Sequence, residues 1–235
     1  QLCFTVNRSS GSDSGFTVYV STNCESDYDD IRFATSDGTT LCDYWIESSS
    51  SSTATIWVEV PSIAGSGDTT LYLYYGNAAA TAVSDGDATF PFFDDFSGTT
   101  LDTDKWTQVG GGTPTFSSGY MTVTANSTDP GKIIATSATT GNNTVFTARF
   151  KVTGGSNVDG RAGLSIKTSA NGRGYNFVVE DFSNVGGVKF LDDGVKWGSD
   201  VDNWAKNTNY VFDIVHDGTN VKARIDGGTW RSVAW

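Results

Sequence analysis

The chain has 235 residues, of which 37% are hydrophobic and 13% aromatic, enough for one large or two small domains with packed cores. Its formal net charge of −12 argues against nucleic-acid binding, which needs a basic stripe, and against binding to anionic membrane surfaces. No run approaches the about 18 consecutive apolar residues of a membrane span. The abundance of Ser, Thr, Gly and Asn predicts an extracellular or cell-surface protein.

Charge is distributed unevenly along the chain. Residues 1–89 carry twelve acidic and two basic side chains, a net charge of −10, whereas residues 90–235 carry fifteen acidic and thirteen basic ones. Such a shift in composition indicates a domain boundary. We therefore expect one domain at 1–89 and another at 90–235. The chain begins at Gln1 inside a predicted strand, so we also expect that an upstream segment has been removed.

The N-terminal segment, "LCFTVNRSSGSDSGFTVYVSTNC", is interpreted as a hairpin that turns near residues 12–14. Folding at that turn places Cys3 opposite Cys24, where paired strands bring two Cβ atoms to the about 3.5–4.5 Å that a disulfide needs. We therefore predict a Cys3–Cys24 disulfide, with Cys42 free or bonded to another chain. The alternative is Cys24–Cys42. The spacing of the three cysteines resembles no zinc site.

Hydrophobic residues alternate with polar ones in "FTVYV", "TATIWVEV", "LYLYY" and "VFTARFKV", which is typical of strands with one buried face. Hairpin turns are predicted at Asn171-Gly172, Asp193-Gly194 and Asp217-Gly218. The run from Ser48 to Ser52 is predicted to be an exposed hairpin loop. No amphipathic helix of three turns is recognisable. The predicted fold class is all-β, with two consecutive antiparallel β-sandwich domains.

Four short motifs in the first predicted domain carry a resemblance: D-I-R-F, Y-W-I-E, W-V-x-V-P and Y-Y-G-N, in this order between residues 29 and 77. They resemble a β-domain family of unknown function found in extracellular proteins of archaea and bacteria. The junction "DGDATF" followed by "FFDDFSG" is similar to the same family. This junction usually leads into a concanavalin-A-like jelly roll, which the region from residue 92 to 235 also resembles. The resemblance therefore implies a jelly roll as the second domain.

The junction raises the question of what Asp94 and Asp95 do. One interpretation is the first strand of the second domain, with the neighbouring phenylalanines packed into its core. A second is a calcium site, because calcium takes clusters of oxygen ligands and lectin-like jelly rolls often use one. A third is catalysis. Calcium is the single cofactor considered.

An enzymatic role is tested against the glutamates and the histidine. Laminarinase-like jelly rolls carry two glutamates in a Glu-x-Asp-x-x-Glu strand, facing one groove. Here Glu180 is the single glutamate beyond residue 59, and Asp181 follows it directly, so the pattern fails. His216 is the sole histidine and ends a predicted strand. We predict no catalytic residues, no hydrolysis of common β-glucans, and no effect of Glu180→Gln other than on stability.

Sugar sites combine exposed aromatic rings with a few polar groups that fix orientation. Two tryptophans flank a polar loop that fits this description, and the candidate set is Trp197, Trp204, Asp200, Asp202 and Asn203. The alternative is that both tryptophans cover the sandwich core. Tyr72, Tyr74 and Tyr75 form a similar stripe, for which packing in the core or between domains is favoured. Sequons at Asn7, Asn126 and Asn142 are candidates for N-glycosylation.

The chain ends at Trp235, and jelly rolls of this kind usually return their last strand beside the first. Either "TWRSVAW" takes the closing position, or a terminal strand pairs with a neighbouring subunit to give a head-to-tail filament. A trimmed piece of a longer surface protein is the alternative. The favoured function is a non-enzymatic, self-associating structural or adhesive surface protein with glycan contact through the second domain. The alternative is a carbohydrate-binding or carbohydrate-cleaving module of a larger secreted polysaccharide-degrading protein.

Overall fold

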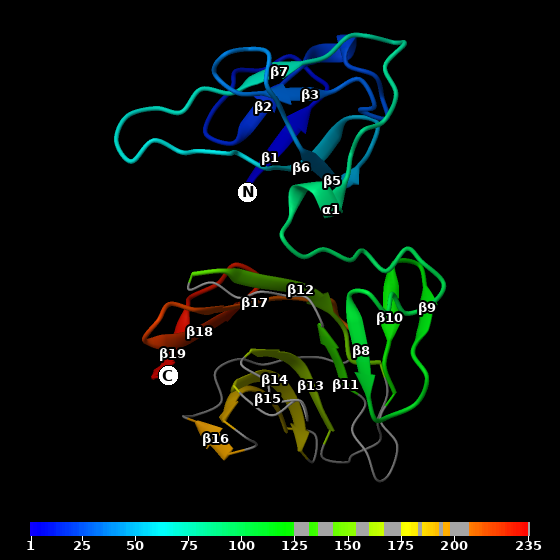
Figure 1. Cartoon of the computed structure of the whole chain (residues 1–235), viewed down its shortest axis with the longest axis vertical. Helices are drawn as coiled ribbons and strands as arrows, with labels where there is room; N and C mark the ends of the chain where they lie inside the picture. Colours follow the sequence, from blue (N-terminus) through cyan, green and yellow to red (C-terminus); the bar gives the residue numbers. More distant parts are fainter. Residues whose placement is uncertain are drawn as a thin grey trace. The chain divides into compact units, whose positions relative to one another are not determined.

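The structure is a computed structural model that describes residues 1–124, 132–135, 143–153, 160–166, 175–182, 185–192, 195–197 and 207–234. The described residues are almost entirely β-structure, arranged in several antiparallel sheets (Figure 1). The chain divides into two compact units, Gln1–Leu101 with Thr115–Thr122, and Asp102–Pro114 with Val123–Trp235. The predicted domains at 1–89 and 90–235, as independently folding parts, stay a prediction.

The first unit contains two sheets that enclose one hydrophobic core. The four-stranded sheet has the order β2-β1-β6-β5, formed by Thr17–Tyr19, Leu2–Asn7, Thr53–Val58 and Tyr44–Ser49. The three-stranded sheet has the order β4-β3-β7, formed by Leu41–Cys42, Arg32–Ala34 and Tyr72–Tyr74. The predicted sandwich character of this region is confirmed.

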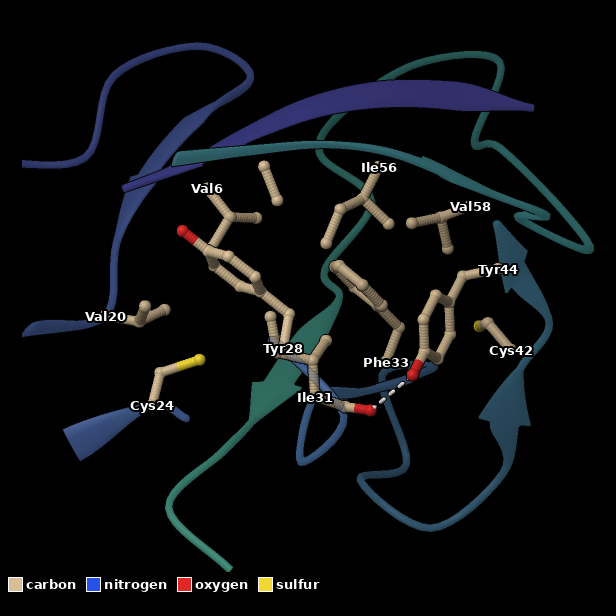
Figure 2. Packing of buried hydrophobic residues seen from close by; sticks show 11 residues of the cluster. Val6, Val20, Cys24, Tyr28, Ile31, Phe33, Cys42, Tyr44, Ile56 and Val58 are labelled. Atoms are coloured by element: carbon tan, nitrogen blue, oxygen red, sulfur yellow. Dashed lines mark hydrogen bonds between the residues drawn. The ribbon is translucent and has the colours of Figure 1, made fainter. Parts of the chain in front are cut away.

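Alternation along the strands explains how this core forms. In β6, Ala54, Ile56 and Val58 are buried, while the intervening residues are half-buried on the other face. Figure 2 shows the core between the sheets, with Phe33 and Tyr44 among the aliphatic side chains. Tyr44 keeps its hydroxyl satisfied there by donating to the carbonyl of Ile31 over 2.8 Å. Each fully buried apolar side chain of this kind contributes about 1.5–3 kcal/mol.

The N-terminal hairpin prediction is wrong. β1 and β2 run parallel, with Thr5 opposite Thr17 and Asn7 opposite Tyr19. Cys3 therefore lies near the start of β1, opposite Trp57 of β6. Cys24 lies beyond the other end, where its carbonyl accepts a hydrogen bond from Arg8 Nε over 2.7 Å.

This geometry also corrects the cysteine prediction. Five residues of extended chain separate Cys3 from Arg8, about 16 Å at the usual rise of a strand, far more than a disulfide spans. The structure holds Cys3, Cys24 and Cys42 as free thiols, so the predicted Cys3–Cys24 disulfide is not formed.

The second unit contains two four-stranded antiparallel sheets and a strand pair. One sheet has the order β12-β17-β18-β19, formed by Val145–Phe150, Tyr210–His216, Asn220–Ile225 and Arg231–Ala234. The other has the order β13-β14-β15-β16, formed by Gly160–Ile166, Tyr175–Phe182, Val185–Asp192 and Val195–Trp197. β8 (Trp106–Val109) pairs with β11 (Lys132–Ala135).

Shorter elements complete the described part of the chain. β9 (Thr115–Ser117) and β10 (Tyr120–Thr122) form a hairpin that belongs to the first unit. The helical segments are η1 (Ser21–Asn23) and α1 (Gly86–Thr89). Thus no three-turn helix occurs among the described residues, as the sequence predicts.

The core of the second unit is built on β17 and β18. Phe212, Ile214, Val221 and Ala223 are fully buried, and the ring of Phe150 from β12 packs edge-on against Phe212. The predicted hairpin between β17 and β18 is confirmed. The antiparallel β13–β14 and β15–β16 pairs also agree with the prediction, although their Asn-Gly and Asp-Gly turns lie outside the described residues.

Both terminal strands pair inside their own units. β1 lies between β2 and β6, so both of its edges are occupied. β19 pairs with β18 at the end of its sheet, so the segment around "TWRSVAW" is used within the fold. Donation of a terminal strand to a neighbouring subunit stays a prediction.

Candidate functional site

The tyrosines of β7 are exposed. Leu73 faces the core, while Tyr72 and Tyr74, one position to either side, lie on the outer face and are each 46% exposed. Tyr75, which follows the strand, is 40% exposed. The rings of Tyr72 and Tyr74 stack with centroids 6.4 Å apart. The prediction that this stripe packs in the core is wrong, whereas its packing between domains stays a prediction; we call Tyr72, Tyr74 and Tyr75 the tyrosine face.

Beside the tyrosine face lies an open groove of about 380 Å³. It is lined by Asp30, Arg32, Tyr74, Tyr75, Asn77, Ala79, Ala80 and Thr81. These residues come from two motifs far apart in the sequence. D-I-R-F supplies Asp30 and Arg32, and Y-Y-G-N supplies Tyr74, Tyr75 and Asn77. The motifs meet because β3 and β7 are antiparallel neighbours, with Arg32 directly opposite Tyr74.

The side chain of Asp30 links the D-I-R-F and Y-Y-G-N motifs through hydrogen bonds. Its carboxylate is buried, with 3% exposure, and accepts a hydrogen bond from the backbone N–H of Gly76. It also accepts from the backbone of Glu25 over 3.1 Å and from the thiol of Cys24 over 3.4 Å. Gly76 has a φ of +95°, which an L side chain rarely adopts, so glycine is needed at the third position of Y-Y-G-N.

Burial, together with the hydrogen bond to Asp30, raises the pKa of the Cys24 thiol to about 12. A thiol with such a pKa is almost entirely protonated at neutral pH, and the thiolate is the reactive form. Cys24 is therefore a structural donor beneath the groove rather than a nucleophile.

Arg32 organises the rim of the groove. Its guanidinium donates to the backbone carbonyls of Asp29, Ile31 and Thr81, at distances of 2.8, 2.6 and 2.6 Å. The bond to Thr81 holds the loop that follows Y-Y-G-N against β3. Both charged side chains of the groove thus have partners within the fold.

Tyr74 is held by the turn between β3 and β4. Its hydroxyl donates to the carbonyl of Gly38 over 2.9 Å. The turn is stabilised by Asp37, which accepts hydrogen bonds from the side chain and backbone of Thr40 and the backbone of Thr39; these hold the pKa of Asp37 well below its usual range.

Several polar groups around the groove are not used by the fold. Among the described residues, the hydroxyls of Tyr72 and Tyr75 and the side-chain N–H₂ of Asn77 have no hydrogen-bond partner. The Asn77 side-chain oxygen accepts from the backbone of Ala79, which fixes the orientation of its amide. The groove therefore offers neutral donors and acceptors beside exposed rings.

The predicted Asp94–Asp95 pair forms local turns. Asp94 accepts a hydrogen bond from the backbone of Phe96, and Asp95 accepts one from Ser97, at 2.8 and 2.9 Å. Within the described ranges, no group of three or more His, Cys, Asp or Glu side chains is arranged to hold a metal. The calcium site therefore stays a prediction.

The prediction of a strand at the junction is wrong, since residues 90–98 form none. Instead, Phe90 and Phe93 pack on the outer face of the four-stranded sheet. The ring of Phe93 lies 4.7 Å from that of Trp45, and Phe90 lies 5.8 Å from Trp57. The two phenylalanine rings stack on each other.

The other predicted site residues lie either in described strands, where their predicted roles are not tested, or outside the described residues. Trp197 ends β16, opposite Phe190 of β15. Trp204, Asp200, Asp202 and Asn203 lie outside the described residues, as do Asn126 and Asn142. Asn7 ends β1 and accepts a hydrogen bond from the Thr53 hydroxyl. Glu180 and Asp181 take consecutive positions in β14, and His216 ends β17. The roles predicted for these residues stay predictions.

Residues 27–109 match the family model of a domain of unknown function, DUF2341. The match includes D-I-R-F, Y-Y-G-N and the junction, in agreement with the predicted resemblance for this part of the chain. No curated protein and no solved structure gives a significant match. No helix in the described part of the chain is long and apolar enough to cross a membrane.

Proposed function

We propose that the protein is a non-enzymatic, extracellular adhesive protein that attaches through the tyrosine face of its first unit. The observation that carries this proposal is the joint exposure of Tyr72 and Tyr74 on β7 and of Tyr75 directly after it. Exposed aromatic clusters on soluble proteins commonly mark interaction sites, because leaving such rings in water is unfavourable. Sheet and turn contacts hold the face rigid, which lowers the entropy lost on binding.

The proposal is tested by attachment of the full chain to immobilised cell-envelope material of the producing organism. Tyr72→Ala/Tyr75→Ala removes two rings that donate no hydrogen bond to the described fold. Ile63→Ala is the matched control, because Ile63 is 59% exposed but lies outside the tyrosine face. We expect the double variant to lose attachment and the control to keep it. Equal attachment of all three proteins would refute the proposal.

The non-enzymatic part has its own test. We expect the full chain to release no reducing sugar from common β-glucans, and Glu180→Gln to leave this unchanged. Sugar release that disappears in Glu180→Gln would instead support the alternative, a glycan-cleaving module.

We also propose that the second unit is a concanavalin-A-like jelly roll, supported by its two four-stranded antiparallel sheets. Self-association is a second candidate function for the chain. It is supported by the position of β19 at the end of its sheet, because edge strands pair readily with other chains. Light scattering at micromolar concentration tests it: growth into polymers would support self-association, and a persistent monomer would exclude it.

A further inference from the structure

We propose that the ligand of the tyrosine face is an uncharged glycan that stacks on the tyrosine rings and hydrogen-bonds to the groove beside them. This inference rests on the proposed adhesive function and names the class of ligand. It concerns the first unit, whereas the sequence alone directs attention to the tryptophans of the second.

The first argument is the pairing of flat rings with neutral polar groups. Tyr72 and Tyr74 present stacked rings, and Tyr75 continues the aromatic surface to the groove. The Tyr75 hydroxyl and the side-chain N–H₂ of Asn77 have no partner in the described fold. Sugars offer an apolar ring face, which can stack on the tyrosine rings, and a rim of hydroxyls, which can hydrogen-bond to the neutral polar groups.

The second argument is charge. Asp30 is buried and accepts three hydrogen bonds, and Arg32 donates to three backbone carbonyls. Asp30 is therefore out of reach of an ionic ligand, and three of the five guanidinium N–H groups of Arg32 are already engaged within the fold. Residues 1–89 carry a net charge of −10, which repels polyanions such as uronic-acid polymers. The chemistry of the groove thus selects an uncharged partner.

The same charge argues against a second copy of the chain as the occupant. Face-to-face association of two copies would bring two segments 1–89, each of net charge −10, close together, and like charges across an interface are unfavourable. A glycan brings no such penalty.

The third argument is shape. The groove is open, and its lining includes the small side chains of Ala79 and Ala80. An apolar small molecule gains most of its affinity in an enclosed pocket, whereas a chain of sugars can lie along an open surface and use repeated contacts.

The experiment uses the full chain in affinity electrophoresis and calorimetry with soluble neutral polysaccharides, namely mixed-linkage β-glucan, galactomannan and xyloglucan. Polygalacturonate is the anionic comparison. We expect retardation by at least one neutral polysaccharide, with little change between low and high salt because no ion pair forms. Tyr72→Ala/Tyr75→Ala should weaken this binding at least about tenfold, because loss of even one aromatic contact that carries binding energy typically has an effect of this size.

Two controls separate a binding defect from a folding defect. Ile63→Ala should bind like the wild type. Near-ultraviolet circular dichroism confirms that each variant is folded.

Binding of polygalacturonate alone, strongly salt-dependent binding, or unchanged binding by Tyr72→Ala/Tyr75→Ala would each overturn the inference. If no neutral polysaccharide binds while attachment to cell-envelope material still depends on the tyrosines, the inference is wrong and the adhesive function stands. If attachment does not depend on the tyrosines either, both fail.

Discussion

The two sheets of the first unit each carry aromatic side chains on their outer faces, but another segment of the chain covers these side chains on only one of the two sheets. On the four-stranded sheet, Trp45 and Trp57 are covered by Phe90 and Phe93 from the junction. On the three-stranded sheet, Tyr72 and Tyr74 are left exposed. The covered face uses indole and phenyl rings, and the Nε1–H of Trp57 donates a hydrogen bond to Glu47. The exposed face uses tyrosines, whose hydroxyls suit contact with water or ligand.

The covering segment is anchored at the edge of the sheet as well as on its face. The backbone N–H of Asp85 donates to Tyr44 and the hydroxyl of Ser84 accepts from Ile46, both in the edge strand β5. Asp85 also caps α1 by accepting from Ala88. The segment from residue 84 to 93 thus protects an edge strand that would otherwise be open to other chains. Aromatic residues on an outer face of this unit are therefore structural where the chain covers them and available for binding where it does not.

The largest expected effect is on the covered face. Phe93→Ala removes a ring in contact with both Trp45 and Phe90, and should destabilise the first unit by about 2–4 kcal/mol, near the lower end for aromatic truncations because the ring is only half-buried. Urea unfolding followed by tryptophan fluorescence measures it. A change in the free energy of unfolding below about 0.5 kcal/mol, typical of surface substitutions, would show that Phe93 does not cover the sheet.

A second prediction tests the position of the Phe93 ring. A Cβ added at Gly86 would collide with the Phe93 ring, so Gly86→Ala should destabilise by about 1–3 kcal/mol through overpacking. Gly65→Ala is the matched control, since its Cβ would meet nothing within 4 Å. In the Phe93→Ala background the Gly86→Ala penalty should largely vanish. Additive effects of the two substitutions in thermal unfolding would argue against the contact.

The third prediction concerns the effect of alkaline pH on stability through Cys24, whose thiol donates a hydrogen bond to Asp30 of the groove. Because the pKa of Cys24 is raised from 9.0 to about 12, the folded state favours the protonated thiol. Its contribution to stability is fully present below pH 9 and is lost as the pH rises toward 12. Unfolding temperatures measured across this range should fall less steeply in Cys24→Ala than in the wild type. An identical slope would mean that Cys24 does not titrate with unfolding.

The smallest stability effect is expected on the tyrosine face itself. Tyr75→Ala should change stability by less than about 0.5 kcal/mol, because an exposed side chain with no partner contributes little. Tyr74→Phe should cost up to about 1 kcal/mol through loss of the bond to Gly38. Urea unfolding of both variants measures the difference. A cost above about 2 kcal/mol for Tyr75→Ala would show that Tyr75 is structural and remove it from the binding surface.

Local patterns predicted much of this fold. Alternation in "TATIWVEV" correctly marks Ala54, Ile56 and Val58 as buried, and the Asp217-Gly218 dipeptide correctly marks the β17–β18 hairpin. These features depend on neighbours in the sequence. The parallel pairing of β1 and β2 could not be predicted in this way, because a strand of three residues such as β2 can pair with its neighbour in either direction.

The candidate site was harder to predict for the same reason. Period-two alternation shows that Tyr72 and Tyr74 share a face, but it does not say which face is covered. The signal that was available lay in D-I-R-F and Y-Y-G-N, where Asp30 and Gly76 need each other's hydrogen bond. Arg32 and Asn77 were missed because their roles appear only when β3 and β7 pair.

The central claim, that the tyrosine face is the binding surface, is tested most directly by hydroxyl-radical footprinting of the full chain with and without a bound neutral polysaccharide. We expect oxidation of Tyr72, Tyr74 and Tyr75 to fall on binding, while that of Phe90 and Phe93 stays low in both states. Unchanged oxidation of the three tyrosines, with protection elsewhere in the chain, would contradict it.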